Sequence, residues 1–293
     1  MPVRPNIEGI DSPDILRRAL IDAQYLADSE LATAIYLALA LGKPLLLEGM
    51  PGVGKTEAAK ALGGVLGRQV VRLQCFEGID AAAALYEWNY PRQMLAIRQA
   101  GDDYINIYED SFLLARPLLL ALQSPAQTLL LIDEIDRSDH EFEAFLLEFL
   151  SDFSISIPET GTVRASQPPV VVLTSNRTRD LHEALRRRCV YHWIDYPDPV
   201  QEAEIVMTRA SSVVRETADA VVAAVGRLRA EPLNKPPGIA ETVEWAEAAT
   251  LLQRLGAQWP DAFRRAIGVA VKDHDDLVYV ADRLASVIPG EAA

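Results

Sequence analysis

The sequence predicts an α/β domain built on a parallel sheet, followed by an all-helical domain. Short apolar runs recur along the first two thirds of the chain, and helical segments lie between most of them. Beyond Pro197–Pro199 these runs stop, and only helix-like periodicity continues. Buried strands that alternate with helices form parallel sheets through right-handed crossovers.

The apolar runs have the length and composition of strands that are buried on both faces. They are Leu45–Leu47, Val70–Leu73, Leu129–Ile132, Val170–Thr174 and Tyr191–Ile194, of which the last is the weakest. Ahead of them, residues 14–41 carry apolar side chains at helical spacing, and Gly42–Pro44 ends that stretch. We therefore expect a five-stranded parallel sheet.

Two segments depart from the alternation of strands and helices. Residues 77–112 contain an Ala-rich helix and a break at Trp88–Pro91, and residues 153–169 are typical of a β-hairpin. After residue 199, apolar side chains recur three, four and seven positions apart, as in amphipathic helices. We predict an α/β domain over residues 1–199, with insertions at about 77–112 and 153–169, and a helical domain over residues 200–293.

Composition narrows the class of protein. The chain has 293 residues and a formal net charge of −14, which argues against non-specific binding to nucleic acid. Cys75 and Cys189 are isolated in the sequence and form no CxxC pair, which suits a reducing compartment. We expect both to be small buried side chains. The four histidines lack metal-ligand spacing, so we expect no metal site made of protein ligands alone. The first residues have no apolar core and Gly42–Pro44 interrupts the longest apolar stretch, so we expect a soluble, cytoplasmic protein without a membrane span.

The segment Gly49–Thr56 matches the pattern G-x-x-x-x-G-K-[ST] between a predicted strand and an Ala-rich helix. Its glycines let the backbone wrap closely around a phosphate, and the helix adds its positive N-terminal dipole. We expect Lys55 to reach the β- and γ-phosphates of a nucleotide, and the Thr56 hydroxyl to ligate Mg²⁺. The predicted nucleotide-binding residues are Gly49, Pro51, Gly52, Val53, Gly54, Lys55, Thr56, Glu57 and Asp133.

Polar side chains follow two further strands. Asp133 and Glu134 come directly after an apolar run, at the edge of the sheet where the phosphate loop also lies. Asp133 is predicted to hold Mg²⁺ together with Thr56, and Glu134 to polarise the attacking water. Asn176 ends another buried run, where its amide can hold that water near the γ-phosphate; a strand-end Asn that caps a turn is the alternative.

Three consecutive arginines, Arg186–Arg188, precede Cys189. Such a run is often a solvated helix face. It follows Asn176 by about a dozen positions, where one protomer can offer a guanidinium to the γ-phosphate held by its neighbour. We predict Arg188 for this role, with Arg187 as the second choice. The predicted catalytic residues are thus Lys55, Glu134, Asn176 and Arg188.

Taken together, the phosphate loop, the carboxylate pair, the strand-end Asn, the arginine run and the helical domain resemble an AAA+ ATPase over nearly the whole chain. The fold implied is an AAA+ P-loop NTPase with a five-stranded parallel core and an all-helical lid. Within AAA+ the chain is similar to the MoxR group, whose helix-2 insertion and pre-sensor-1 hairpin correspond to residues 77–112 and 153–169. Four stretches are similar to CoxD-type members, chaperones associated with maturation of molybdenum-containing carbon monoxide dehydrogenase and related hydroxylases. These stretches are Glu87–Arg92, Ile157–Gly161, Thr174–Arg179 and Cys189–Pro197.

The resemblance implies ATP and Mg²⁺ as cofactors and assembly of the chain into a homo-oligomeric ring, a hexamer. It also implies a client metalloenzyme that is remodelled, and a partner protein with a von Willebrand factor A domain. One departure concerns the lid. MoxR relatives carry a sensor-2 arginine in a Ser-Pro-Arg-like motif, whereas the corresponding stretch here, Pro237–Trp245, contains no arginine. No sensor-2 residue is therefore assigned.

Two other functions remain open from the sequence. A nucleic-acid motor or loader is favoured by the arginines at 177, 179 and 186–188, and opposed by the net charge. A nucleotide-gated scaffold with little turnover is the other alternative, against which the intact Glu134 argues. Trp88 and Tyr90 either contact a client or pack the insertion onto its own domain.

Overall fold

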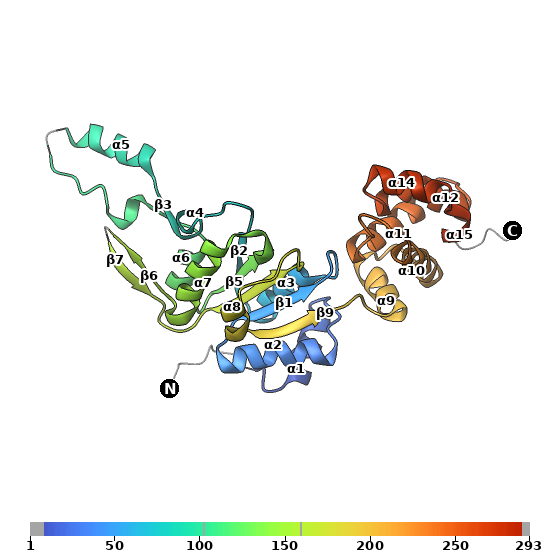
Figure 1. Cartoon of the computed structure of the whole chain (residues 1–293), viewed down its shortest axis with the longest axis horizontal. Coiled ribbons are helices and arrows are strands. Elements are labelled where there is room, and N and C mark those ends of the chain that lie inside the picture. Colours follow the sequence, from blue (N-terminus) through green and yellow to red (C-terminus); the bar gives the residue numbers. More distant parts are fainter. Residues whose placement is uncertain (1–8, 102, 159, 289–293) are drawn as a thin grey trace. The chain divides into compact units, whose positions relative to one another are not determined.

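The computed structural model describes residues 9–101, 103–158 and 160–288, and the chain divides into two compact units (Figure 1). The first unit comprises most of the chain up to Ile194. The second comprises the chain from Asp195 onward together with two short segments, Gln24–Leu26 and Met50–Gly54. The middle of the predicted phosphate loop, Met50–Gly54, thus belongs to the second unit.

The first unit contains the predicted sheet, and the expectation of five parallel strands is confirmed. Its strand order is β2-β5-β8-β1-β9. The strands are β1 Leu45–Gly49, β2 Gln69–Gln74, β5 Thr128–Asp133, β8 Val170–Ser175 and β9 Val190–Ile194. Every residue of β1, β5 and β8 is buried, which explains why these segments read as continuous apolar runs. Since β8 lies between β5 and β1, the residues that follow these three strands meet at one edge of the sheet.

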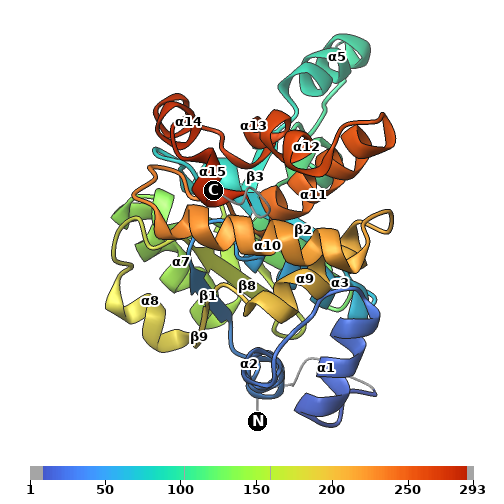
Figure 2. The ribbon, with the colours of Figure 1, turned by 90° about the vertical axis from the view of Figure 1, so that its right-hand side faces the viewer.

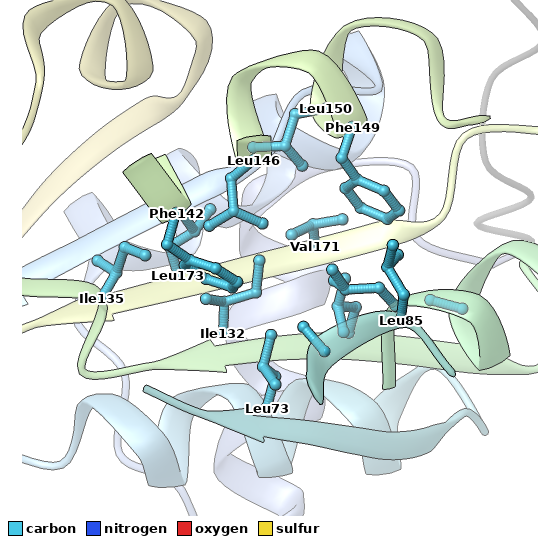
Figure 3. Close-up of a cluster of buried hydrophobic side chains, with 14 of the residues drawn as sticks. Leu73, Leu85, Ile132, Ile135, Phe142, Leu146, Phe149, Leu150, Val171 and Leu173 are labelled. Carbon is cyan, nitrogen blue, oxygen red and sulfur yellow. The ribbon is translucent and has the colours of Figure 1, made fainter. Parts of the chain in front are cut away.

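Helices surround this sheet, and α1 packs against it through α2 and α3. They are α1 Pro13–Asp22, α2 Ser29–Leu41, α3 Lys55–Val65, α6 Pro117–Gln123, α7 His140–Asp152 and α8 Glu183–Arg188. The predicted end of α2 is confirmed, because Gly42 adopts a left-handed φ of 63° at its C-cap. One core cluster is drawn in Figure 3, where α7 contributes side chains at i, i+4 and i+7 spacing. Its members include Leu73, Ile132 and Leu173 from three strands and Phe142, Leu146 and Phe149 from α7.

The two predicted insertions have different structures. The hairpin is confirmed: β6 Ser154–Ile157 pairs antiparallel with β7 Gly161–Arg164. The other insertion holds more than the predicted Ala-rich helix, α4 Ala81–Leu85. A short ribbon, β3 Tyr86–Trp88 with β4 Leu113–Ala115, carries a further helix, α5 Tyr90–Ala100, and a 3₁₀ turn at Asp110–Phe112. Figures 1 and 2 show α5 projecting from the rest of this unit.

The break predicted at Trp88–Pro91 is the start of α5. The Asn89 side chain caps this helix by accepting a 3.1 Å hydrogen bond from the Arg92 N–H, and Pro91 occupies its first turn. Trp88 is 7% exposed and packs edge-to-face against Tyr108, whereas Tyr90 is 63% exposed. Of the two aromatic residues proposed as client contacts, Trp88 therefore packs the insertion and Tyr90 lies at the surface.

After Asp195, all regular elements in the described residues are helices, in agreement with the helical domain predicted over residues 200–293. Its helices are α9 Pro199–Arg209, α10 Arg215–Ala230, α11 Ile239–Arg254, α12 Trp259–Arg265, α13 Ile267–Ala270, α14 His274–Ala281 and α15 Leu284–Val287. Trp245 and Phe263 are fully buried at its centre, and the Trp245 indole N–H donates to the Phe263 carbonyl at 3.2 Å. Across both units, the described helices include none long and apolar enough to cross a membrane.

Candidate functional site

The loop between β1 and α3 has the backbone that the phosphate-loop pattern predicts. Gly52 and Gly54 adopt φ values of 79° and 94°, which residues with a Cβ rarely reach. Helix α3 begins at Lys55, so its first unpaired N–H groups lie at the end of this loop. Val53 is buried, whereas Glu57 points its carboxylate to Lys60 at 2.7 Å on the surface of α3.

Lys55 is buried at the start of this helix, with 6% of its surface exposed. Its ammonium donates a 2.8 Å hydrogen bond to the Gly49 carbonyl and so arches back over the loop. Burial lowers the pKa of Lys55 from 10.5 to about 8, because desolvation disfavours the charged form. Four carboxylates oppose this shift, those of Asp136, Asp133, Glu134 and Glu48. The amine is thus surrounded by acidic groups at the edge of the sheet.

Thr56 and Asp133, the predicted magnesium ligands, are joined by a hydrogen bond. The Thr56 hydroxyl donates to Asp133 Oδ1 at 3.0 Å, and Asp133 is 2% exposed. A second hydroxyl, that of Thr174 on β8, donates to the same oxygen at 2.5 Å and accepts from the Glu134 N–H at 2.9 Å. Carboxylate and hydroxyl oxygens are the ligands that Mg²⁺ prefers, so this pair fits the cation.

The other oxygen of Asp133 binds Arg72, a residue of β2. Arg72 donates from Nε at 2.8 Å and contacts the same oxygen from its terminal nitrogen at 2.5 Å. That nitrogen also donates to the side chain of Gln74, whose amide donates in turn to Glu134 at 2.9 Å. The two candidate carboxylates are therefore linked through β2.

Sequence reasoning missed Arg72 and Gln74. As polar residues in an otherwise apolar strand, they could have been noticed in the sequence. Their contact with Asp133 and Glu134, however, requires that β2 lie next to β5 in the sheet. The sequence alone does not reveal that strand order.

Glu134 lies just beyond β5 in a left-handed conformation, with φ 55° and ψ 50°. This conformation is rare for a residue with a long side chain and is held here by the hydrogen bond from its N–H to Thr174. The carboxylate is 32% exposed and also accepts from Arg137 at 3.1 Å. A half-exposed carboxylate at this edge is placed to accept a proton from water.

Asn176 follows β8 at the same edge and is half-buried. Its backbone N–H donates to the Asp136 carboxylate at 3.2 Å, and the Thr178 N–H donates to it at 2.9 Å. Asp136 is 2% exposed and was not among the predicted residues. It ties the turn after β8 to the segment after β5, and thereby fixes where Asn176 stands relative to Glu134.

The three consecutive arginines have three different partners. Arg186 pairs with Glu48 of β1 at 2.8 Å, and Glu48 is 1% exposed. Arg187 pairs with Glu183 within α8. Arg188, the predicted finger, is exposed and donates to the Leu147 carbonyl and the Ser151 hydroxyl of α7. The structure thus brings together Lys55, Thr56, Asp133, Glu134 and Asn176, and leaves Arg188 bound to α7 of its own chain.

Histidine and cysteine side chains form no candidate metal site in the part of the chain that the structure describes. The described residues contain no group of three or more His, Cys, Asp or Glu side chains that could hold a metal ion. Burial raises the pKa of both Cys75 and Cys189 to about 12, and both thiols are free. Ligation of Mg²⁺ would therefore depend on Thr56 and Asp133 together with groups supplied by a nucleotide and water.

Comparison with known proteins gives matches to the core and to most of the chain. Residues 45–194 match the family described as "ATPase family associated with various cellular activities (AAA)". Protein NorQ of Paracoccus denitrificans is 24% identical over 212 residues, which cover 70% of this chain and 72% of NorQ. The heavy chain 1 of human cytoplasmic dynein 2 is 46% identical over 63 residues, or 20% of this chain, and the match spans 2% of the dynein's length.

A solved structure also matches in fold. A mutant of RuvB from Thermotoga maritima aligns with a TM-score of 0.52 at 18% sequence identity. The alignment covers 94% of this chain and 82% of the RuvB chain. At this level of identity the likeness concerns the fold alone, that of a parallel core sheet with a C-terminal helical part.

Proposed function

The chain belongs to the AAA family of ATPases, and from this membership we propose that it hydrolyses ATP with Mg²⁺ at the Gly49–Thr56 loop. One observation carries the proposal. Thr56, at the end of the loop, and Asp133, at the end of β5, meet through a 3.0 Å hydrogen bond although 77 positions separate them. The N-terminus of α3 and two oxygen ligands thus lie together, as phosphate and Mg²⁺ binding requires.

The residues of the loop have distinct tasks in this proposal. The N–H groups of Gly52, Val53 and Gly54 face the phosphates, and the Lys55 ammonium offsets their negative charge. Thr56 and Asp133 hold the Mg²⁺ ion, which supplies positive charge to the phosphate oxygens during transfer. A bound phosphate would add a negative charge close to the Lys55 amine, whose charged form is disfavoured by burial.

Glu134 accepts the proton of the attacking water, and Asn176 orients that water. The left-handed backbone at Glu134 and the Asp136 contacts hold the two residues at the same edge of the sheet. These contacts preorganise the catalytic groups, so that little reorganisation is needed during the reaction.

We assign Arg188 to the active site of a neighbouring copy in a ring, a hexamer, with Arg187 as the second choice. Support for an action in trans comes from the exposure of Arg188 and from its hydrogen bonds, which in the described residues go to α7 and not to Lys55 or Glu134. Its hydrogen bonds to α7 hold the guanidinium at the surface of the unit. An arginine supplied in this way stabilises negative charge in the transition state and raises the rate of hydrolysis by about 10³–10⁵.

The proposed biological task is ATP-driven remodelling of a client protein by a member of the MoxR group. Its support is the similarity to NorQ over 70% of the chain and the presence of both predicted insertions. Helix α5 exposes several apolar side chains, which suits contact with a partner. We propose a molybdenum hydroxylase or carbon monoxide dehydrogenase as the client, with a von Willebrand factor A-domain protein as a further partner.

The experiment that tests this function separates binding from hydrolysis. Calorimetric titration with Mg·ATP should show binding by the wild type and by Glu134→Gln, and none by Lys55→Ala. Hydrolysis by Glu134→Gln should fall by about 10²–10⁴, the usual contribution of a general base. Glu141→Gln, a change of an exposed carboxylate on α7, is the matched control and should hydrolyse ATP normally. Absence of binding by the wild type overturns the proposal.

A pull-down then addresses the client. Glu134→Gln charged with ATP should retain the client that the wild type releases on hydrolysis. Identification of a molybdenum enzyme among the retained proteins supports the finer assignment. Retention of DNA or RNA instead would favour the nucleic-acid motor.

A further inference from the structure

One buried carboxylate links three helices of the second unit by hydrogen bonds. Glu202 of α9 is 2% exposed and accepts two hydrogen bonds from Arg229 of α10, at 2.7 and 2.8 Å. The Thr242 hydroxyl of α11 donates to the same carboxylate at 2.8 Å. This bidentate geometry leaves Arg229 with a fixed orientation.

Arg229 extends this network toward the segments that precede α9 and α11. Its Nε donates to the Pro237 carbonyl at 2.8 Å, in the turn that leads into α11. Its guanidinium stacks over the ring of Tyr196, 3.9 Å from the ring centroid. One side chain therefore holds both the Pro237–Gly238 turn and Tyr196.

Both of these elements contact the phosphate loop. The Tyr196 hydroxyl donates to the Pro51 carbonyl at 3.1 Å, and the Ile239 N–H donates to the Gly52 carbonyl at 3.0 Å. Gly52 and Gly238 approach so closely that a Cβ added to either one would lie 2.7 Å from the Cα of the other. Glycine is thus required at both positions for this contact.

The two accepted hydrogen bonds set the direction of two N–H groups. A peptide unit is planar and trans, so the carbonyl of one residue points opposite to the N–H of the next. Fixing the Pro51 carbonyl therefore orients the Gly52 N–H, and fixing the Gly52 carbonyl orients the Val53 N–H. These are N–H groups that the proposed function assigns to phosphate.

We propose that Arg229 is a positioning residue for nucleotide binding, which acts on the phosphate loop through Tyr196 and the Pro237–Gly238 turn. The proposal rests on the proposed function, since it concerns the same loop. It assigns the connection between loop and lid to an arginine of α10, in a chain whose α11 begins without one. Arg229 touches no nucleotide in this arrangement.

The test compares nucleotide affinity with turnover in three variants. Arg229→Lys keeps a positive charge beside Glu202 but cannot also bind the Pro237 carbonyl and stack on Tyr196. Tyr196→Phe removes one hydrogen bond to the loop, and Gly238→Ala forces the turn away from Gly52. For each variant, the Kd of Mg·ADP and Mg·ATP is measured by calorimetry, and kcat is measured at saturating ATP.

We expect Kd to rise about three- to tenfold in each variant, the worth of one hydrogen bond, while kcat stays within about twofold. A purely structural role of Arg229 would instead lower the melting temperature of the nucleotide-free protein and leave Kd unchanged. If Arg229→Lys does not fold, Tyr196→Phe and Gly238→Ala decide the question.

Matched controls exist in the same unit. Tyr279 repeats the chemistry of Tyr196: its hydroxyl donates to Glu231 at 2.8 Å and Arg283 stacks on its ring at 4.0 Å. Gly226 of α10 has no atom within 4 Å of an added Cβ. Tyr279→Phe and Gly226→Ala should therefore leave Kd unchanged.

Weaker nucleotide binding in the three variants, with both controls unchanged, supports the proposal. Unchanged Kd in the variants, while the wild type binds Mg·ATP, overturns this proposal alone. A wild type that takes up no nucleotide overturns the proposed function, and this proposal with it.

Discussion

The Gln74 amide donates a 2.9 Å hydrogen bond to the Glu134 carboxylate across 60 positions of sequence. Gln74 is held in turn by Arg72, which also binds Asp133. One oxygen of the proposed general base, Oε2 of Glu134, is thus bound by a residue of the neighbouring strand β2. A carboxylate oxygen that accepts from an amide has one fewer lone pair for a water molecule and a restricted rotamer.

Gln74→Leu should therefore release Glu134 and raise basal ATP hydrolysis by about two- to tenfold, the equivalent of one hydrogen bond. Steady-state phosphate release at saturating ATP measures the effect. Gln69→Leu, an exposed change at the other end of β2, is the control and should leave the rate unaltered. A lower rate in Gln74→Leu would mean that the amide supports the base rather than restrains it.

Alanine variants, alone and mixed, show which of Arg188 and Arg187 acts on the nucleotide of a neighbouring copy. Arg188→Ala should lose about 10³ in hydrolysis, because the finger stabilises transition-state charge in the neighbouring copy. Arg187, which pairs with the exposed Glu183 in its own helix, should tolerate the change to Ala. Mixing Arg188→Ala with Lys55→Ala should restore part of the activity, since intact loops then meet intact fingers. Full activity of Arg188→Ala together with loss in Arg187→Ala would transfer the role to Arg187.

Arg186 is expected to stabilise the fold, which argues against its use in a nucleic-acid motor or loader. It pairs with the buried Glu48, so removal of Arg186 takes away the ion-pair partner of a buried carboxylate in β1. We expect Arg186→Ala to lower the free energy of unfolding by about 3 kcal/mol. Arg187→Ala, in the same helix, should cost less than about 0.5 kcal/mol, because its ion pair is exposed.

Denaturant unfolding of the two variants measures the difference. Equal stabilities would show that the Arg186 pair contributes nothing to folding. The partners of Arg179 and Arg186 also weaken the case for a nucleic-acid surface, since both guanidinium groups are bound to buried carboxylates of this chain, Glu143 and Glu48.

Sequence patterns were sufficient for the sheet and for the loop because both depend on local signals. Fully buried strands read as apolar runs, and Gly52 and Gly54 mark the left-handed turns of the loop. The order of strands then puts Thr56 beside Asp133, as expected from a parallel sheet with right-handed crossovers.

Other parts of the site depend on long-range pairing. Asp136 and Gln74 bind residues that follow β8 and β5, and nothing in the local sequence identifies those partners. Helix α5 was missed because Tyr90-Pro91 reads as a break, although Pro is favoured in the first turn of a helix. Arg229 was missed for a similar reason: one arginine within an amphipathic helix is ordinarily a solvated residue.

The two cysteines should resist alkylation in the folded protein. Burial raises the pKa of the Cys189 thiol from 9.0 to about 12, so its reactive thiolate is scarcer at pH 8 by about a thousandfold. Burial raises the pKa of Cys75 similarly. Iodoacetamide at pH 8 followed by mass spectrometry should find both residues unmodified in the native protein and modified in denaturant. Rapid labelling of native Cys189 would contradict this expectation.

The apolar surface of α5 tests the proposed contact with a client. Met94 and Leu95 are 57% and 56% exposed on a helix that projects from the first unit. Leu95→Ser should change the free energy of unfolding by less than about 0.5 kcal/mol, since little buried surface is lost. If the client buries this side chain, the amount retained by Glu134→Gln in the presence of ATP should fall about tenfold in the double variant.

Leu255 supplies the matched control, because it is 76% exposed at the end of α11 in the other unit. Leu255→Ser combined with Glu134→Gln should retain the client as Glu134→Gln alone does. Equal retention by all three proteins would place the client contact elsewhere than on α5. A parallel loss in both Ser variants would indicate general apolar adhesion, because the two leucines share exposure and chemistry but lie in different units.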